Sequence, residues 1–149
     1  SYTIAQNKSA ADLSFNKKLW NPHVLYVTAY LTDIGKGGLV CDYFNNFKLF
    51  AHKGKIGLQL GDNKIIESEV LAKTSGHLVM KLTETGDLDI RFDNKTILSE
   101  KLSKDLTKIQ SGYVTCGRLQ GKELSGNLQT YKGIIDDLRF TMNELSRTP

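Results

Sequence analysis

The sequence predicts an all-β protein, a two-sheet antiparallel β-sandwich, and three observations support this prediction. Short segments with alternating apolar and polar residues recur along the chain. Glycine, asparagine and aspartate, which favour tight turns, separate several of these segments. Stretches with the periodicity of an amphipathic helix are scarce. Ten or so short strands at this spacing indicate a sandwich or a barrel.

The alternating segments predict ten strands, taken in chain order. They span residues 23–31, 39–44, 47–52, 55–61, 64–70, 77–84, 88–93, 95–102, 112–119 and 133–142. In the segment 88–93 the apolar residues Leu88, Ile90 and Phe92 share one face, which is typical of a half-buried antiparallel strand.

Three short stretches predict hairpin turns, because glycine, asparagine and aspartate adopt a positive φ at little cost. They are residues 61–63, 85–87 and 93–95. The segments 9–15 and 99–109 carry no long apolar stripe, so we expect loops or short helical turns there.

Length, charge and composition limit the class of protein. The 149 residues, 40% of them hydrophobic, are enough for one domain spanning 1–149 with a core of its own. No apolar run is long enough to cross a membrane, so membrane insertion is not expected. The net charge of +4 comes from lysines scattered among carboxylates, a pattern that does not indicate nucleic-acid binding. Because the chain opens on Ser1 rather than Met, we expect a piece of a larger protein.

The only two cysteines, Cys41 and Cys116, each lie in a predicted strand. No second cysteine or histidine stands at zinc-ligand spacing from either of them. We expect two buried thiols, and a disulfide stays open if the protein is exported.

The C-terminal half resembles a known family. Residues 133–146, GIIDDLRFTMNELS, are similar to the pattern G-x-I-D-D-V-R-I-Y-N-x-x-L-S that closes laminin-G-like and concanavalin A-like jelly-roll domains. The turn Asp93-Asn94-Lys95 resembles the D-G-K turn of that family, and His77 stands where its W-H-H-V strand has a histidine. The tryptophan of that strand is absent here. The resemblance implies a concanavalin A-like jelly roll and a divergent member of this superfamily.

The resemblance also bears on the adjacent aspartates Asp136 and Asp137. In related domains a carboxylate of this strand can ligate a structural Ca²⁺ ion, which prefers oxygen ligands. The resemblance therefore makes both residues candidate metal ligands. In the alternative interpretation Asp136 accepts backbone hydrogen bonds, and Asp137 faces solvent beside Arg139.

Catalysis is not expected. Glycosidases of this superfamily carry alternate carboxylates on one strand, because glycoside hydrolysis needs two carboxyl groups at a set separation. The nearest matches, Glu67/Glu69 and Asp87/Asp89, are most simply solvated side chains. We therefore expect a non-catalytic carbohydrate-binding or adhesion module of an extracellular, cell-surface or virion protein. The alternative is a structural or protein-interaction domain without a glycan ligand.

Two groups of residues are candidates for ligand binding. Sugars are bound by aromatic rings and by polar side chains that bond their hydroxyls. The first group is Asp42, Tyr43, Asn45 and Asn46, where a tyrosine stands among polar residues. The second is Arg91 and Arg139, which would together bind the carboxylate of an acidic sugar if their strands are neighbours.

Overall fold

The computed structural model describes most of the chain as strands of two sheets. The described residues are 2–4, 12–15, 23–43, 47–60, 64–83, 85–102, 112–116 and 130–144. The strands are β1 (Tyr2–Ile4), β2 (Asp12–Phe15), β3 (His23–Leu31), β4 (Gly38–Tyr43), β5 (Phe47–His52), β6 (Lys55–Leu60), β7 (Ile65–Glu67), β8 (Gly76–Thr83), β9 (Asp87–Phe92), β10 (Lys95–Lys101), β11 (Gly112–Cys116) and β12 (Ile135–Glu144). None of these ranges contains a helix, so none of them holds a helix able to cross a membrane.

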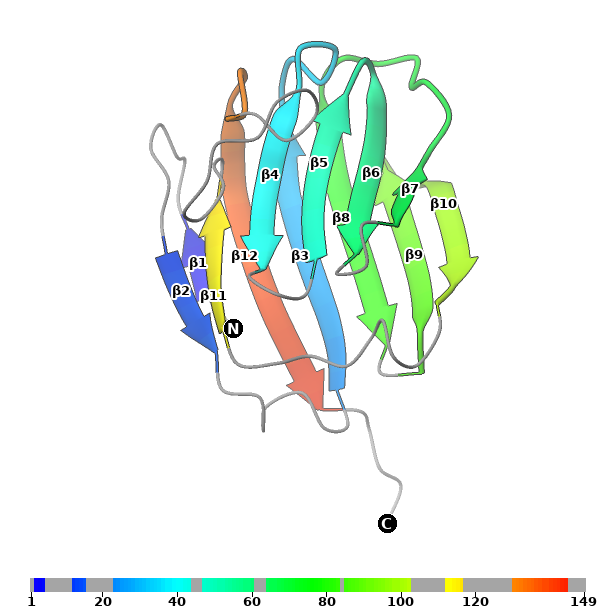
Figure 1. Cartoon of the computed structure of the whole chain (residues 1–149). Coiled ribbons are helices and arrows are strands. Elements are labelled where there is room, and N and C mark those ends of the chain that lie inside the picture. Colours follow the sequence, from blue (N-terminus) through cyan, green and yellow to red (C-terminus); the bar gives the residue numbers. More distant parts are fainter. Residues whose placement is uncertain are drawn as a thin grey trace.

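Two six-stranded sheets face one another (Figure 1). Sheet A has the order β1-β12-β3-β8-β9-β10, and sheet B has the order β2-β11-β4-β5-β6-β7. All strand pairs within them are antiparallel. The predicted two-sheet antiparallel sandwich is therefore confirmed.

Two hairpin turns show why turn residues mark strand ends. Asp93 and Asn94 join β9 to β10 with φ angles of 50° and 66°, as the sequence predicts. Lys53 and Gly54 join β5 to β6 with φ angles of 50° and 81°. Two consecutive positive φ angles match the twist of the flanking strands.

One predicted loop is a strand. For residues 9–15 the sequence predicts a loop or a short helical turn, but Asp12–Phe15 form β2, which pairs with β11. A short edge strand takes its conformation from the backbone of its partner more than from its own side-chain pattern.

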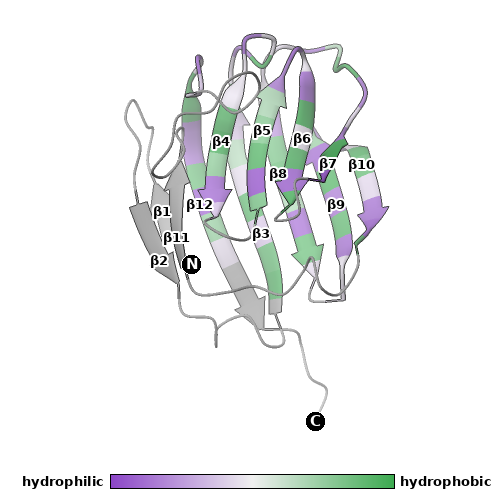
Figure 2. Ribbon diagram, in the orientation of Figure 1, coloured by the Kyte–Doolittle hydropathy of each residue, from purple (hydrophilic) through white to green (hydrophobic). Residues whose placement is uncertain are grey.

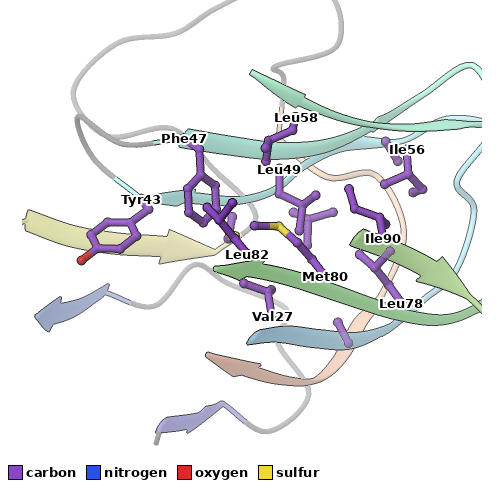
Figure 3. Packing of buried hydrophobic residues seen from close by; sticks show 14 of the residues in the cluster. Val27, Tyr43, Phe47, Leu49, Ile56, Leu58, Leu78, Met80, Leu82 and Ile90 are labelled. Atoms are coloured by element: carbon purple, nitrogen blue, oxygen red, sulfur yellow. The ribbon is translucent and has the colours of Figure 1, made fainter. Parts of the chain in front are cut away.

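The core lies between the sheets and holds the apolar alternates of both (Figure 3). In sheet A these are Leu25, Val27, Ala29 and Leu31 of β3, Leu78, Met80 and Leu82 of β8, and Leu88, Ile90 and Phe92 of β9. Figure 2 shows hydrophobic and hydrophilic bands alternating along the strands. Because alternate residues of a strand point to opposite faces, the residues between these core positions lie on the outer face of sheet A.

Candidate functional site

The outer face of sheet A is the surface on which polar and aromatic side chains gather. On β3 it carries Tyr26, Thr28 and Tyr30, which alternate with fully buried residues. Tyr30, the penultimate residue of β3, is 43% exposed, an open position for a large aromatic side chain that is paired on both sides. This face can therefore offer a ligand an aromatic ring as well as hydrogen-bonding groups.

Tyr30 stands between two polar residues of the neighbouring strands. Asp136 of β12 is directly opposite it on one side, and His77 of β8 is directly opposite on the other. Both flanking residues are exposed. Directly opposite side chains in a sheet lie within about 5.5 Å at their Cβ atoms, so the three form one continuous surface.

Asp93 accepts a hydrogen bond from the backbone of His77, the residue directly opposite Tyr30 on β8. The Oδ1 atom of Asp93 accepts a hydrogen bond from the backbone N–H of His77 at 2.8 Å, and its Oδ2 atom is 2.8 Å from Nζ of Lys73. These bonds lower the pKa of Asp93, the His77 backbone bond being the larger cause, and the Asp93 carboxylate raises the pKa of Lys73. Asp93 and Lys73 are therefore both charged at neutral pH.

Arg91 and Arg139 lie on one row of this face but not side by side. The row runs from Arg139 of β12 through Thr28 of β3 and Val79 of β8 to Arg91 of β9. Their backbones are thus three strand spacings apart, about 14 Å. Joint binding of one carboxylate by Arg91 and Arg139 requires that their strands be neighbours, and the strand order β12-β3-β8-β9 does not meet this requirement.

Each of these arginines has an aspartate of its own strand. The Nε atom of Arg91 is 3.2 Å from Oδ2 of Asp89, and that of Arg139 is 3.2 Å from Oδ1 of Asp137. Both pairs are solvent-exposed, so each contributes little to stability. They do reduce the positive charge that either arginine presents to an anion.

A polar hollow of about 510 Å³ opens at the β9–β10 edge of the same face. It is lined by Asp87, Leu88, Asp89, Arg91, Thr96, Ser99, Glu100 and Lys101. Its volume lies within the range of small-molecule sites, but its walls are more polar than those of a typical drug-sized pocket. Hydroxyl, carboxylate and cationic groups all reach it, which suits a ligand rich in hydroxyl groups.

Asp87 is the most strongly hydrogen-bonded carboxylate of the hollow. It binds Nζ of Lys101 at 3.0 Å and the hydroxyl of Thr85 at 3.0 Å. The bond from Lys101, followed by that from Thr85, lowers the pKa of Asp87. This carboxylate is therefore ionised at neutral pH and acts as an acceptor.

Asp42 and Tyr43, from the first predicted group of ligand-binding residues, lie in sheet B and not on the outer face of sheet A. Asp42 and Tyr43 belong to β4, and they are only 2% and 0% exposed. The ring of Tyr43 packs edge-to-face against Phe47 and Phe140, with centroids 5.7 and 5.3 Å apart, and burial raises its pKa to about 12. Because they are buried, Asp42 and Tyr43 are not accessible to a ligand in this structure. Asn45 and Asn46 lie outside the described residues.

The two adjacent aspartates occupy a β-bulge. Asp136 pairs with Tyr30 and Arg139 with Thr28, so β12 has one residue more than β3 between these pairs. The extra residue leaves Asp137 with a φ of 49°, a conformation that aspartate tolerates better than most residues. Asp137 is exposed beside Arg139, as the alternative interpretation has it for this residue, and Asp136 is exposed as well.

Calcium ligation would need more donors than this bulge supplies. Ca²⁺ takes six to eight oxygen ligands, and the carboxylate of Asp137 is already bonded to Arg139. In the part of the chain that the structure describes, no group of three or more His, Cys, Asp or Glu side chains is placed to hold a metal ion. The donors described do not by themselves make a calcium site.

Tyr30 is the candidate that sequence reasoning missed, although a signal for it was present. In residues 23–31 the buried alternates are Leu25, Val27, Ala29 and Leu31. The same alternation assigns Tyr26 and Tyr30 to the opposite face. Tyrosine is amphipathic and common in cores, so the pattern alone does not reveal whether that face is covered.

Comparison with known proteins finds similarity at the level of structure. No protein-family model matches the chain, and no curated protein sequence matches it. A native heptameric SAP-like pentraxin from Limulus polyphemus matches with a TM-score of 0.57 and 19% identity, over 80% of this chain and 69% of the pentraxin. A botulinum neurotoxin type C structure, from work on the dependence of cell entry on two ganglioside molecules, matches with a TM-score of 0.63 and 14% identity, over 95% of this chain.

A third match is the binding domain of botulinum neurotoxin DC in complex with rat synaptotagmin II, with a TM-score of 0.63 and 14% identity. The matched region covers 39% of each of these two toxin chains. These similarities confirm the predicted fold, a concanavalin A-like, laminin G-like jelly roll.

Proposed function

We propose that the protein is a non-catalytic carbohydrate-binding or adhesion module of a larger extracellular, cell-surface or virion protein, and that the outer face of sheet A is its binding surface. One observation carries this proposal. The exposed ring of Tyr30 lies beside polar residues of both neighbouring strands, on the face that continues into the polar hollow at β9–β10. An aromatic ring beside hydrogen-bonding groups is the arrangement by which proteins bind sugars.

The similar structures give this proposal indirect support. One toxin structure concerns cell entry that depends on two ganglioside molecules, and another is a toxin binding domain in complex with rat synaptotagmin II. The same fold thus serves recognition in other proteins. Because one fold hosts many functions, the proposal depends on the residues of this chain and not on that likeness.

The charges favour an uncharged glycan over an acidic one. The hollow holds three carboxylates, Asp87, Asp89 and Glu100, against the two cations Arg91 and Lys101. Both cations are already paired with aspartates of the hollow. An acidic sugar would meet a net negative surface there, whereas the hydroxyls of a neutral sugar could bond both donors and acceptors.

The same electrostatics support binding over hydrolysis. A glycosidase needs one carboxylic acid whose pKa is raised so that it can protonate the leaving oxygen. Asp87 has a lowered pKa, and Asp89 is bonded to Arg91. Asp87 is therefore not prepared to donate a proton at neutral pH.

A glycan array with the purified chain tests the proposal, and Tyr30→Ala is the informative variant. We expect the wild type to bind neutral glycans and Tyr30→Ala to bind them about tenfold or more weakly, since the stacking surface is lost. Because Tyr30 is 43% exposed, its replacement should lower the free energy of unfolding by only about 1 kcal/mol, which leaves the protein folded in the binding assay.

Val70→Ala is the matched control, because Val70 is 64% exposed and lies outside sheet A. It should bind as the wild type does. Arg91→Ala, which opens the hollow, should also weaken binding. Stronger binding of sialylated than neutral glycans, abolished by Arg91→Ala with Arg139→Ala, would instead favour the acidic ligand.

An array without any binding would move the assignment to the alternative, a structural or protein-interaction jelly roll. The exposed large apolar side chains give only limited support to a protein-docking surface. Among the described residues with assigned burial they are Ile65, Val70 and Ile134 besides Tyr30, and they belong to different segments of the chain. Apolar residues scattered singly over a surface are common and need no partner.

Calcium binding at Asp136 and Asp137 stays a prediction of the family resemblance, and the melting temperature tests it. A bound ion stabilises the folded state, so the melting temperature should be higher in calcium than in excess chelator. Asp136→Asn should remove this difference. Equal melting temperatures in calcium and chelator would exclude a stabilising ion.

A further inference from the structure

The two cysteines of the chain occupy opposed positions on neighbouring strands. They are 75 positions apart in the sequence. In sheet B, β11 pairs with β4, and Cys116 is the residue directly opposite Cys41. The pairing of β11 with β4 therefore brings together two cysteines that are distant in the sequence.

The register meets the distance requirement of a disulfide. Opposed residues of an antiparallel pair have Cα atoms about 4.5 to 5.5 Å apart. Disulfides join residues with Cα atoms about 4.4 to 6.8 Å apart. The strand register therefore places the backbones of these two positions within the range that a disulfide spans.

The position also gives such a bond a structural role. The ladder between β4 and β11 consists of three residue pairs, from Val114–Tyr43 to Cys116–Cys41. The edge strand β2 joins sheet B through β11. A covalent link at the end of this short ladder would hold both strands to the rest of the sheet.

We infer that Cys41 and Cys116 form a cross-strand disulfide when the protein is exposed to a disulfide oxidant such as oxidised glutathione. The two thiols lose two protons and two electrons, and one S–S bond forms between them. Oxidised glutathione takes up both electrons and both protons and leaves as two glutathione thiols. Disulfides of this kind persist in extracellular and other oxidising compartments.

Peptide mapping tests the inference directly. The purified chain is equilibrated with a mixture of reduced and oxidised glutathione, denatured, alkylated and digested with trypsin. Cleavage after Lys36, Lys48, Lys108 and Arg118 releases residues 37–48 and 109–118, each with one cysteine. We expect these two peptides to be joined, with neither cysteine alkylated until a reductant is added.

Melting temperature supplies the second readout. Reduction should lower the melting temperature of the wild type by on the order of 10 °C, because the bond closes a long loop. The double variant Cys41→Ala/Cys116→Ala should not respond to the reductant. If that variant does not fold, the reduced and oxidised wild type still give the comparison.

Two results would overturn the inference. One is complete alkylation of both cysteines without reductant after equilibration in the oxidising mixture. The other is a mixed disulfide with glutathione on each cysteine, which would mean that the two sulfur atoms do not reach one another.

Discussion

Replacing Tyr43 by alanine is expected to lower the free energy of unfolding by about 3–5 kcal/mol. The ring of Tyr43 belongs to sheet B and packs edge-to-face against Phe140 of sheet A, so its loss leaves a cavity between the two sheets. Such a change is a large part of the total stability of a domain, which is about 5–15 kcal/mol. Urea denaturation of wild type and variant measures it.

Tyr43→Phe and Tyr30→Ala separate the possible causes. Tyr43→Phe keeps the buried ring, so it should change the free energy of unfolding by about 1 kcal/mol at most. Tyr30→Ala removes a partly exposed ring and should lower the urea midpoint far less than Tyr43→Ala does. If Tyr43→Ala instead weakened glycan binding at unaltered stability, the assignment of Tyr43 to the core would be wrong.

Gly38→Ala should lower the free energy of unfolding by about 3 kcal/mol or more, the combined cost of backbone strain and a steric overlap. Gly38 has a φ of 123°, which residues with a Cβ atom rarely adopt. An added Cβ would lie 2.6 Å from the carbonyl oxygen of Thr130 and 2.6 Å from Cα of Tyr131. Both contacts are with backbone, which cannot rotate away.

Gly35→Ala, in the turn that precedes β4, is the control, because a Cβ there would have no atom within 4 Å and its φ is not positive. It should leave stability within about 0.5 kcal/mol of the wild type. Thermal unfolding followed by circular dichroism distinguishes the two variants. Equal stability of Gly38→Ala and Gly35→Ala would mean that the segment at Thr130 does not pack against β4.

Much of the fold could be predicted from local patterns. The strand at 23–31 and the turn at Asp93-Asn94 follow from period-two alternation and from residues that adopt a positive φ. The segment 12–15 could not be predicted in this way, because β2 is an edge strand specified by its pairing with β11.

For the candidate site, too, local patterns predict the face of a residue but not its neighbours on other strands. Alternation correctly assigns Arg91 to the polar face of its strand, but it does not reveal that two strands separate it from Arg139. It places Tyr43 beside polar residues in the sequence, whereas the fold buries its ring between the sheets.

The sequence by itself determined the strands β3 to β12, many of their inward and outward faces, several of their turns and a sandwich or barrel of strands, because these depend on the side-chain period and on the φ preferences of single residues. The jelly-roll class came from the resemblance of the C-terminal half to a known family. Only the tertiary structure decided that Asp136, Tyr30 and His77 share a row and that Cys41 is opposite Cys116. Strand order and register come from pairing between distant segments. Alternation leaves that pairing undetermined, since every strand with a buried face carries the same pattern.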